Sequence, residues 1–261
     1  MDYDHARHAG NAGDVLKQAA LIALLEAMVR DPATLTYVET HAGAGVYPLG
    51  SAGEWGDGVL RVWNARSGLL GRYAEIVRGF SAPGATRPGS VPGSPLVARA
   101  LLREGDPMVL HEIDPGSASV RRRTLPRADV RERDGLSGVA ELGQTRAFVL
   151  IDPPYTRKQE WTDAARAMAR IAGTPAALWY PVKALTRPRA LLQELAKLGV
   201  HGVAVELHWT PLRLKRDRLN GAGLVLVGVP PEAIAAICAA LPDLGAALQT
   251  HGEWAAIEIG F

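Results

Sequence analysis

The sequence has 261 residues, 48% of them hydrophobic, and a net charge of +2. This size fits one large α/β domain, and the charge permits nucleic-acid binding without demanding it. A single cysteine, Cys238, excludes a disulfide framework and a thiolate metal cluster, and we expect no metal. No apolar run reaches transmembrane length, and the polar start from Met1 to His5 is unlike a signal peptide. We therefore expect a cytoplasmic protein without a membrane segment.

The first predicted elements are a helix and a strand that leads into a glycine loop. The spacing of apolar residues predicts a helix over Val15–Val29 and a buried strand over Leu35–Glu39. Two glycines in the following loop, residues 40–45, allow a ligand to approach the backbone closely. Pro48 stands where a dinucleotide fingerprint needs its third glycine, which disfavours a nicotinamide cofactor. His41 is suited either to a cofactor contact or to capping the turn, and the sequence leaves both open.

The spacing between the first two core strands is too long for a simple nucleotide-binding unit. One helix normally joins them, whereas the next predicted strand here begins only at Met108. Amphipathic helices over Val59–Trp63 and Leu69–Phe80 fill the gap. We expect an inserted helical subdomain over residues 51–93, within a domain formed by residues 1–50 and 94–261. Its arginines are a candidate RNA surface, although such arginines are more often simply solvated: Arg61, Arg66, Arg72 and Arg78.

Polar residues follow the next predicted core strands. Ser94 opens a helix, where it suits capping and a ligand contact equally well. Glu112 ends the strand Met108–Ile113 and can accept both ribose hydroxyls of a nucleoside cofactor. Asp134 and Gly135 follow a third strand, where the acid can bind an adenine amino group and the glycine lets the ring lie flat. These positions fit contacts to a nucleoside.

The chemistry is most specific at Asp152-Pro153-Pro154-Tyr155, directly after the buried strand Phe148–Ile151. Pro153 ends the strand, so Asp152 is expected at the carboxyl edge of the sheet, where open α/β folds bind ligands. A carboxylate and the carbonyl of Pro153 can accept both N–H groups of an exocyclic amine, while Tyr155 stacks on the base. The stretch resembles motif IV of amino methyltransferases that use S-adenosylmethionine (SAM). The alternative is a Pro-Pro turn with an acidic cap.

The C-terminal third completes the expected sheet. Strands are predicted over Ala176–Tyr180, Val203–Trp209 and Leu224–Val229, with a helix over Pro188–Leu198. Seven strands with a terminal antiparallel pair form the methyltransferase variant of the doubly wound sheet. The expected fold class is therefore α/β and Rossmann-like, with a mostly parallel sheet. A basic loop from Arg213 to Gly221 is suited either to phosphate contacts or to simple solvation.

Five stretches together resemble one bacterial family, the 23S ribosomal RNA adenine-N6 methyltransferases of the J type. They spread over nearly the whole chain and comprise residues 8–11, 14–17, 40–45, 92–96 and 151–155. The resemblance implies a Rossmann-like core with a small helical insertion and SAM as cofactor. It also implies a monomer that modifies one adenine of protein-free 23S rRNA.

The resemblance assigns roles to individual residues. Asp152 matches the catalytic acid, with Pro153 and Tyr155 beside it, and the target adenine is expected to flip out of its stack. Tyr3 and Tyr155 are expected to meet that adenine. Gln18 stands where relatives carry histidine and keeps a donor and an acceptor. The SAM contacts carry over onto Gln18, His41, Ser94, Glu112, Asp134, Gly135 and Asp152.

Other functions stay open at this point. A DNA adenine-N6 methyltransferase would use the same motif, and only a substrate test separates it from an rRNA enzyme. Protein glutamine methyltransferases prefer asparagine in place of Asp152, which disfavours them. A non-catalytic nucleic-acid-binding factor in the use of external DNA would need no SAM, and the glycine loop with Glu112 and Asp134 argues against it.

Overall fold

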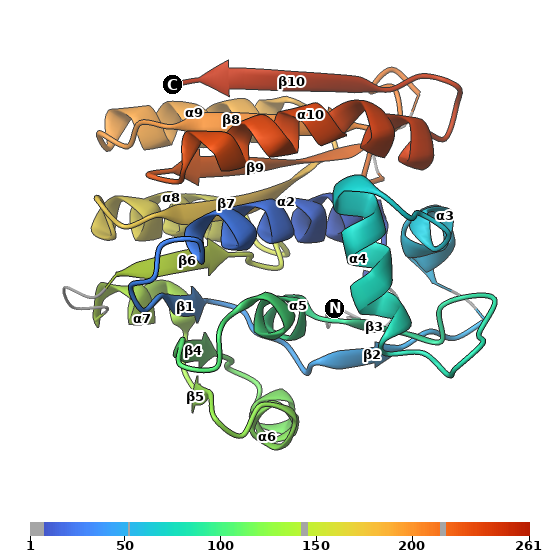
Figure 1. Cartoon of the computed structure of the whole chain (residues 1–261). Helices are drawn as coiled ribbons and strands as arrows, with labels where there is room; N and C mark the ends of the chain where they lie inside the picture. The colour runs from blue at the N-terminus through green and yellow to red at the C-terminus, as the bar shows by residue number, and fades with distance from the viewer. Residues whose placement is uncertain (1–7, 52, 142–145, 215–217) are drawn as a thin grey trace.

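A mostly parallel sheet of eight strands runs through the molecule, with helices on both faces (Figure 1). The computed structural model describes residues 8–51, 53–141, 146–214 and 218–261. The strand order is β10-β8-β9-β7-β6-β1-β4-β5, and only β9 and β10 run against the others. The strands are β1 (Thr36–Glu39), β4 (Met108–His111), β5 (Asp129–Arg131), β6 (Ala147–Ile151), β7 (Ala176–Val182), β8 (Val203–His208), β9 (Gly221–Val227) and β10 (Ala255–Gly260).

The helices form a layer on each face of the sheet, so the core has two halves (Figure 1). The first layer contains α2 (Ala12–Met28), α4 (Gly68–Arg78), α5 (Ser94–Leu101) and α10 (Pro231–Leu248). The second contains α7 (Gly135–Gly138) with the 3-10 turn η2 (Val139–Glu141), α8 (Gln159–Arg170) and α9 (Thr186–Lys197). Helix α6 (Pro115–Thr124) packs at the β5 edge.

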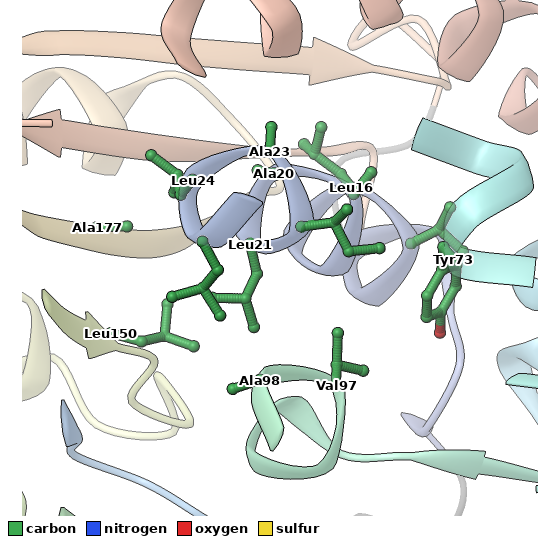
Figure 2. Close-up of a cluster of buried hydrophobic side chains, with 14 of the residues drawn as sticks. Leu16, Ala20, Leu21, Ala23, Leu24, Tyr73, Val97, Ala98, Leu150 and Ala177 are labelled. Atoms are coloured by element: carbon green, nitrogen blue, oxygen red, sulfur yellow. The ribbon is translucent and has the colours of Figure 1, made fainter. Parts of the chain in front are cut away.

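Helix α2 is the centre of the first layer. Of its 17 residues, 15 are buried, because α4, α5 and α10 surround it above the sheet. Leu16, Leu21 and Leu24 lie among side chains of the neighbouring elements, including Leu150 of β6 and Val97 of α5 (Figure 2). A helix that is apolar on all sides is stable only when it is covered on all sides. The predicted helix is confirmed, and it begins three residues earlier than its apolar spacing indicated.

The long connection after β1 is closed at its base by a two-stranded ribbon. Strand β2 (Val46–Pro48) pairs antiparallel with β3 (Ser90–Pro92), which brings the two ends of the connection together. Between them lie the 3-10 turn η1 (Glu54–Asp57), α3 (Val59–Val62) and α4, so the two helices predicted there are confirmed. Helix α4 packs on α2 and α10, and the amide of Val59 donates to the carbonyl of Gly10 at 2.8 Å.

Two details of the predicted sheet are wrong. The sheet has eight strands rather than seven, because β10 adds an edge strand beside β8. Most residues of β10 are exposed, so no buried alternation announces it in the sequence. Strand β7 also continues through Pro181 to Val182. Beyond Leu178, β7 pairs with β9 but no longer with β6, so a proline there interrupts no second ladder.

Helix α10 is unusually apolar for a covering helix. Among the described residues it alone is long and apolar enough to cross a membrane by length and composition, with 18 residues and a mean hydropathy of 1.4. It carries Glu232, Pro242 and Asp243, and it packs against α2, α4, β8 and β10. These contacts are those of a helix that covers a sheet.

We predict that Leu24→Ala lowers the free energy of unfolding by about 2–5 kcal/mol. Leu24 is fully buried in the cluster of Figure 2, so its removal leaves a cavity between α2 and the sheet. Urea unfolding followed by circular dichroism measures the loss. Leu198→Ala is the control, because Leu198 is 40% exposed and should cost less than about 0.5 kcal/mol. Equal losses in both variants would contradict the packing described here.

Candidate active site

The carboxyl ends of the parallel strands gather four of the predicted residues around one cavity. His41 follows β1, Glu112 follows β4, and Asp134 and Gly135 follow β5. All four line a cavity of about 390 Å³, a size suited to a small-molecule ligand. Its other lining residues include Thr40, Ile113, Leu136 and Pro154. The structure therefore brings these four positions together at one cavity.

Glu112 is held by the backbone of two loops. Its carboxylate accepts from the amide of Gly43 at 2.7 Å and from the amide of Asp114 at 2.8 Å. The first contact ties the glycine loop after β1 to the end of β4. Carboxylate oxygens have about four acceptor sites in total, so Glu112 keeps acceptor capacity toward the cavity.

Asp134 caps the N-terminus of α7 and stays an acceptor. It accepts from the amides of Leu136 and Ser137 at 3.1 and 3.2 Å and from the Ser137 hydroxyl at 2.5 Å. Burial opposes ionisation, but these hydrogen bonds outweigh it and lower the pKa of Asp134. Gly135 has a packing reason of its own, since a Cβ there would lie 2.1 Å from the carbonyl oxygen of Thr40.

His41 lies at the cavity in its neutral form. Burial lowers its pKa, although the nearby charges of Asp152, Asp134 and Glu112 act in the opposite direction. One ring nitrogen, Nδ1, lies 2.8 Å from the hydroxyl oxygen of Thr40. The ring therefore lines the cavity and also makes a contact within its turn, so both sequence interpretations of His41 keep support.

A buried acid beneath the loop was missed as a functional candidate in the sequence. Glu39 is fully buried at the end of β1 and accepts from the Ser94 hydroxyl and, at 2.6 Å, from the Tyr37 hydroxyl. Burial raises the pKa of Glu39 to about 7, against those hydrogen bonds and the charge of Arg121. Ser94 is the first residue of α5 and Gly93 is the cap, so Ser94 contacts Glu39 instead of capping the helix. An acid inside an apolar strand was the available signal.

Asp152 is paired with a lysine from the buried helix. Lys17 Nζ lies 2.6 Å from Asp152 Oδ2 and 2.8 Å from Asp14 Oδ1. Burial alone would lower the pKa of Lys17, but the two carboxylates outweigh it and raise that pKa well above its ordinary value. Lys17 is therefore charged and fixes one oxygen of Asp152. No local sequence pattern indicates this pair, because its two residues are 135 positions apart.

Tyr155 stands in a strained backbone conformation beside Asp152. Its φ of 53° is the only positive value found at a non-glycine residue in the described part of the chain. Such a residue costs about 1–3 kcal/mol unless its surroundings hold it. Here the hydroxyl donates to the carbonyl of Trp179 at 2.7 Å, and the ring lies 4.4 Å from the ring of Trp161. The hydroxyl thus holds the ring in place, and its proton is already used in this hydrogen bond.

The remaining predicted residues lie outside the cavity lining. Gln18 is 2% exposed on α2, and its side-chain oxygen has no hydrogen-bond partner among the described residues. Ser94, Asp152 and Tyr155 are also absent from the lining. Tyr3 lies outside the described residues. No group of three or more metal-binding side chains occurs in the part of the chain that is described.

We predict that Glu39 makes stability fall as the pH rises toward about 7. The folded pKa of about 7 exceeds the ordinary value of 4.5, so the folded state binds more protons between these pH values. The stabilisation from Glu39 is fully present below pH 4.5 and is lost as the pH rises through about 7. The loss is about 3 kcal/mol at most. Urea unfolding of the wild type and Glu39→Gln from pH 4 to 8 measures it. Parallel curves for the two proteins would refute the prediction.

Several known proteins are similar to this chain over most of its length. A family model described as "Ribosomal RNA large subunit methyltransferase D, RlmJ" matches residues 32–257. Ribosomal RNA large subunit methyltransferase J of Escherichia coli K12 is 33% identical, and that of Haemophilus influenzae Rd is 29% identical, each over 88% of both chains. A crystal structure of a Legionella pneumophila protein, 27% identical, covers 97% of this chain and 98% of its own with a TM-score of 0.88. The chain therefore belongs to the ribosomal RNA large subunit methyltransferase J family.

Proposed function

We propose that this protein transfers a methyl group from SAM to the exocyclic N6 of one adenine in 23S ribosomal RNA. The observation that carries the proposal is the position of Asp152 at the end of β6, beside Tyr155. Glu112 and Asp134, two acids suited to a nucleoside, line the cavity at the same edge. The relatives from E. coli and H. influenzae are named large-subunit rRNA methyltransferases, which agrees with this chemistry.

The cavity fits the nucleoside part of SAM. Glu112 offers acceptors for the ribose hydroxyls and Asp134 for the adenine amino group, and both lie beside apolar Leu136. Ile113 is 72% exposed at the cavity, so a flat ring there would cover an apolar surface. The oxygen of Gln18, which has no hydrogen-bond partner among the described residues, suits the ammonium at the amino-acid end, which supports the contact proposed at this position. Bound SAM supplies a methyl group on a sulfonium.

Asp152 acts as an orienting acceptor for the target amine. Lys17 holds one carboxylate oxygen, which leaves the other for an N–H of the adenine. The carbonyl of Pro153 takes the second N–H, so the nitrogen lone pair is drawn out of the ring and aimed at the methyl group. Positioning of this kind supplies much of the rate, with effective molarities of about 10⁵–10⁸ M. The methyl–sulfur bond would break as the bond to N6 forms, S-adenosylhomocysteine would be released, and the cationic nitrogen would then give its proton to water.

Tyr155 receives the base after it has left the RNA stack. Flipping costs a few kcal/mol, and one aromatic stack returns about 1–3 kcal/mol. Trp161 lies near the ring and Trp179 accepts its hydroxyl, so the ring is fixed before the base arrives. Tyr3 remains a proposed substrate contact.

The protein is proposed to act as a cytoplasmic monomer on protein-free RNA, without a membrane. Residues 51–93 are proposed as a helical subdomain inserted into a Rossmann-like domain of residues 1–50 and 94–261, with RNA contact as its role. Of its arginines, Arg61 and Arg72 form ion pairs, and Arg78 donates to main-chain carbonyls.

DNA is the rival substrate, because the same site can methylate adenine in either polymer. Matched transcripts and single-stranded DNA of the same sequence, each incubated with SAM, separate the two. Formation of N6-methyladenosine in the RNA alone supports the proposal. Methylation of the DNA alone would replace it, and a protein that binds either polymer but not SAM would be a non-catalytic factor.

We predict that Asp152→Ala lowers methyl transfer by about 10²- to 10³-fold, the usual loss when one preorganised hydrogen-bonding group is removed from a reacting centre. SAM affinity should change little, because the nucleoside contacts lie on Glu112 and Asp134. Mass spectrometry of the modified RNA gives the rate, and calorimetry gives the SAM affinity. Weak SAM binding with normal turnover at saturation would assign Asp152 to the cofactor alone.

We predict that Tyr155→Phe lowers the turnover number about 2- to 10-fold by removing the tether to Trp179. One hydrogen bond contributes about 0.5–1.5 kcal/mol, and the ring in its strained conformation depends on it. Tyr155→Ala should lose more, since it also removes the stack. Phenylalanine performing as badly as alanine would show that the hydroxyl itself touches the substrate.

A further inference from the structure

The sheet has a step beside the acceptor residue. Strand β6 ends at Ile151, which is level with Leu178 of β7. From there β7 continues to Val182, still paired with β9, which pairs in turn with β8 up to His208. At about 3.3 Å per residue, the stretch from Leu178 to Val182 extends β7 about 13 Å beyond the end of β6. We call this extension, on one side of Asp152, the wall. On the other side, β1 ends no higher than β6, with Glu39 paired to Leu150.

Basic side chains lie at the top of this wall and beside it. Lys183 follows β7 directly, and its carbonyl accepts from the side chain of Asn220 at 2.9 Å, next to β9. Arg187 lies in the first turn of α9, with its guanidinium 5.9 Å from the centre of the Trp161 ring. We call the exposed set formed by Lys158, Lys183, Arg187 and Arg218 the basic rim.

The basic rim carries charge that the protein does not neutralise. Within the described residues, none of its four members forms an ion pair. Nearby cations differ in this respect, since Arg157 pairs with Glu160 and Arg213 pairs with Glu253. Of the predicted basic loop, residues 215–217 lie outside the described part of the chain.

The rim is connected to the base site through aromatic rings. Arg187 lies over Trp161, and Trp161 lies 4.4 Å from Tyr155, the residue proposed to stack on the adenine. A nucleotide whose base reaches Asp152 at the foot of the wall leaves its phosphates near the top. Cations at that height that form no ion pair among the described residues suit phosphates, which otherwise bind small counterions.

We propose that the basic rim binds the phosphates that flank the target adenosine, so the RNA strand crosses the wall while one base descends to Asp152. The inference rests on the proposed function and adds the path of the RNA strand to it. Phosphate contacts position the strand and carry no sequence information, so the rim sets the register of the RNA and not its sequence.

The experiment uses the full chain and an in vitro transcript of large-subunit rRNA. The test variant is Lys183→Gln/Arg187→Gln. The matched control is Arg30→Gln/Lys197→Gln, which removes the same two residue types from exposed positions at the C-terminal ends of α2 and α9. A third variant, Arg66→Gln/Arg87→Gln, tests residues 51–93, and its Arg87 also lies 5.9 Å from a tryptophan ring, that of Trp55.

The readouts are RNA affinity at several KCl concentrations, KM and turnover for methyl transfer, and SAM affinity. We expect the test variant to weaken RNA binding several-fold and to raise KM, with turnover at saturating RNA and SAM affinity unchanged. Each single-strand phosphate contact contributes about 0.7 to the slope of log affinity against log salt, so two lost contacts should lower it by about 1.4. The control should retain the full slope.

The rim proposal fails if the test variant keeps the wild-type slope, if the control loses as much, or if only Arg66→Gln/Arg87→Gln loses affinity. A wild type that does not bind the transcript also overturns it. A wild type that binds the transcript with SAM present but never methylates it overturns the proposed function instead, and the slopes still decide the rim.

Discussion

The position of the Asp152 carboxylate depends on one ion pair between a buried helix and the end of a strand. Lys17 can stay charged inside α2 only because Asp14 and Asp152 lie within hydrogen-bond distance of its ammonium. Buried pairs of this kind contribute little net stability, since both charges lose their hydration. Their value here is orientation. The helix at the centre of the hydrophobic core therefore also sets where the carboxylate points, so packing and chemistry share one element.

The cavity carries charges of both signs, whereas the basic rim carries cations alone. In the cavity, Glu112 and Asp134 accept hydrogen bonds, and backbone amides hold them in place. Beside the cavity, β7 continues past the end of β6 toward Lys183, which forms no ion pair among the described residues. The proposed cofactor and a polyanionic strand would suit these two environments. The two regions meet near β7, which pairs in parallel with β6 and antiparallel with β9.

Much of the site could be predicted because parallel strands end at one edge. A polar residue after each apolar strand was enough to bring His41, Glu112 and Asp134 together. The contacts of Lys17 could not be predicted, since a lysine near the start of a helix says nothing about a carboxylate 135 positions away. Glu39 was visible as an acid in an apolar strand, but its partners come from distant elements. Strand β10 was not predicted, because an exposed edge strand shows no alternation of buried and exposed residues.

The left-handed backbone at Tyr155 restricts how this position can vary. Glycine or asparagine would adopt that conformation cheaply, yet neither supplies an aromatic surface. Any aromatic residue placed there bears the same torsional penalty, and the nearby tryptophans must offset it each time the protein folds. The loop therefore cannot lose this backbone strain and keep an aromatic side chain at position 155. Substitutions that relax the strain should give proteins that are more stable but no longer bind a base at the proposed site.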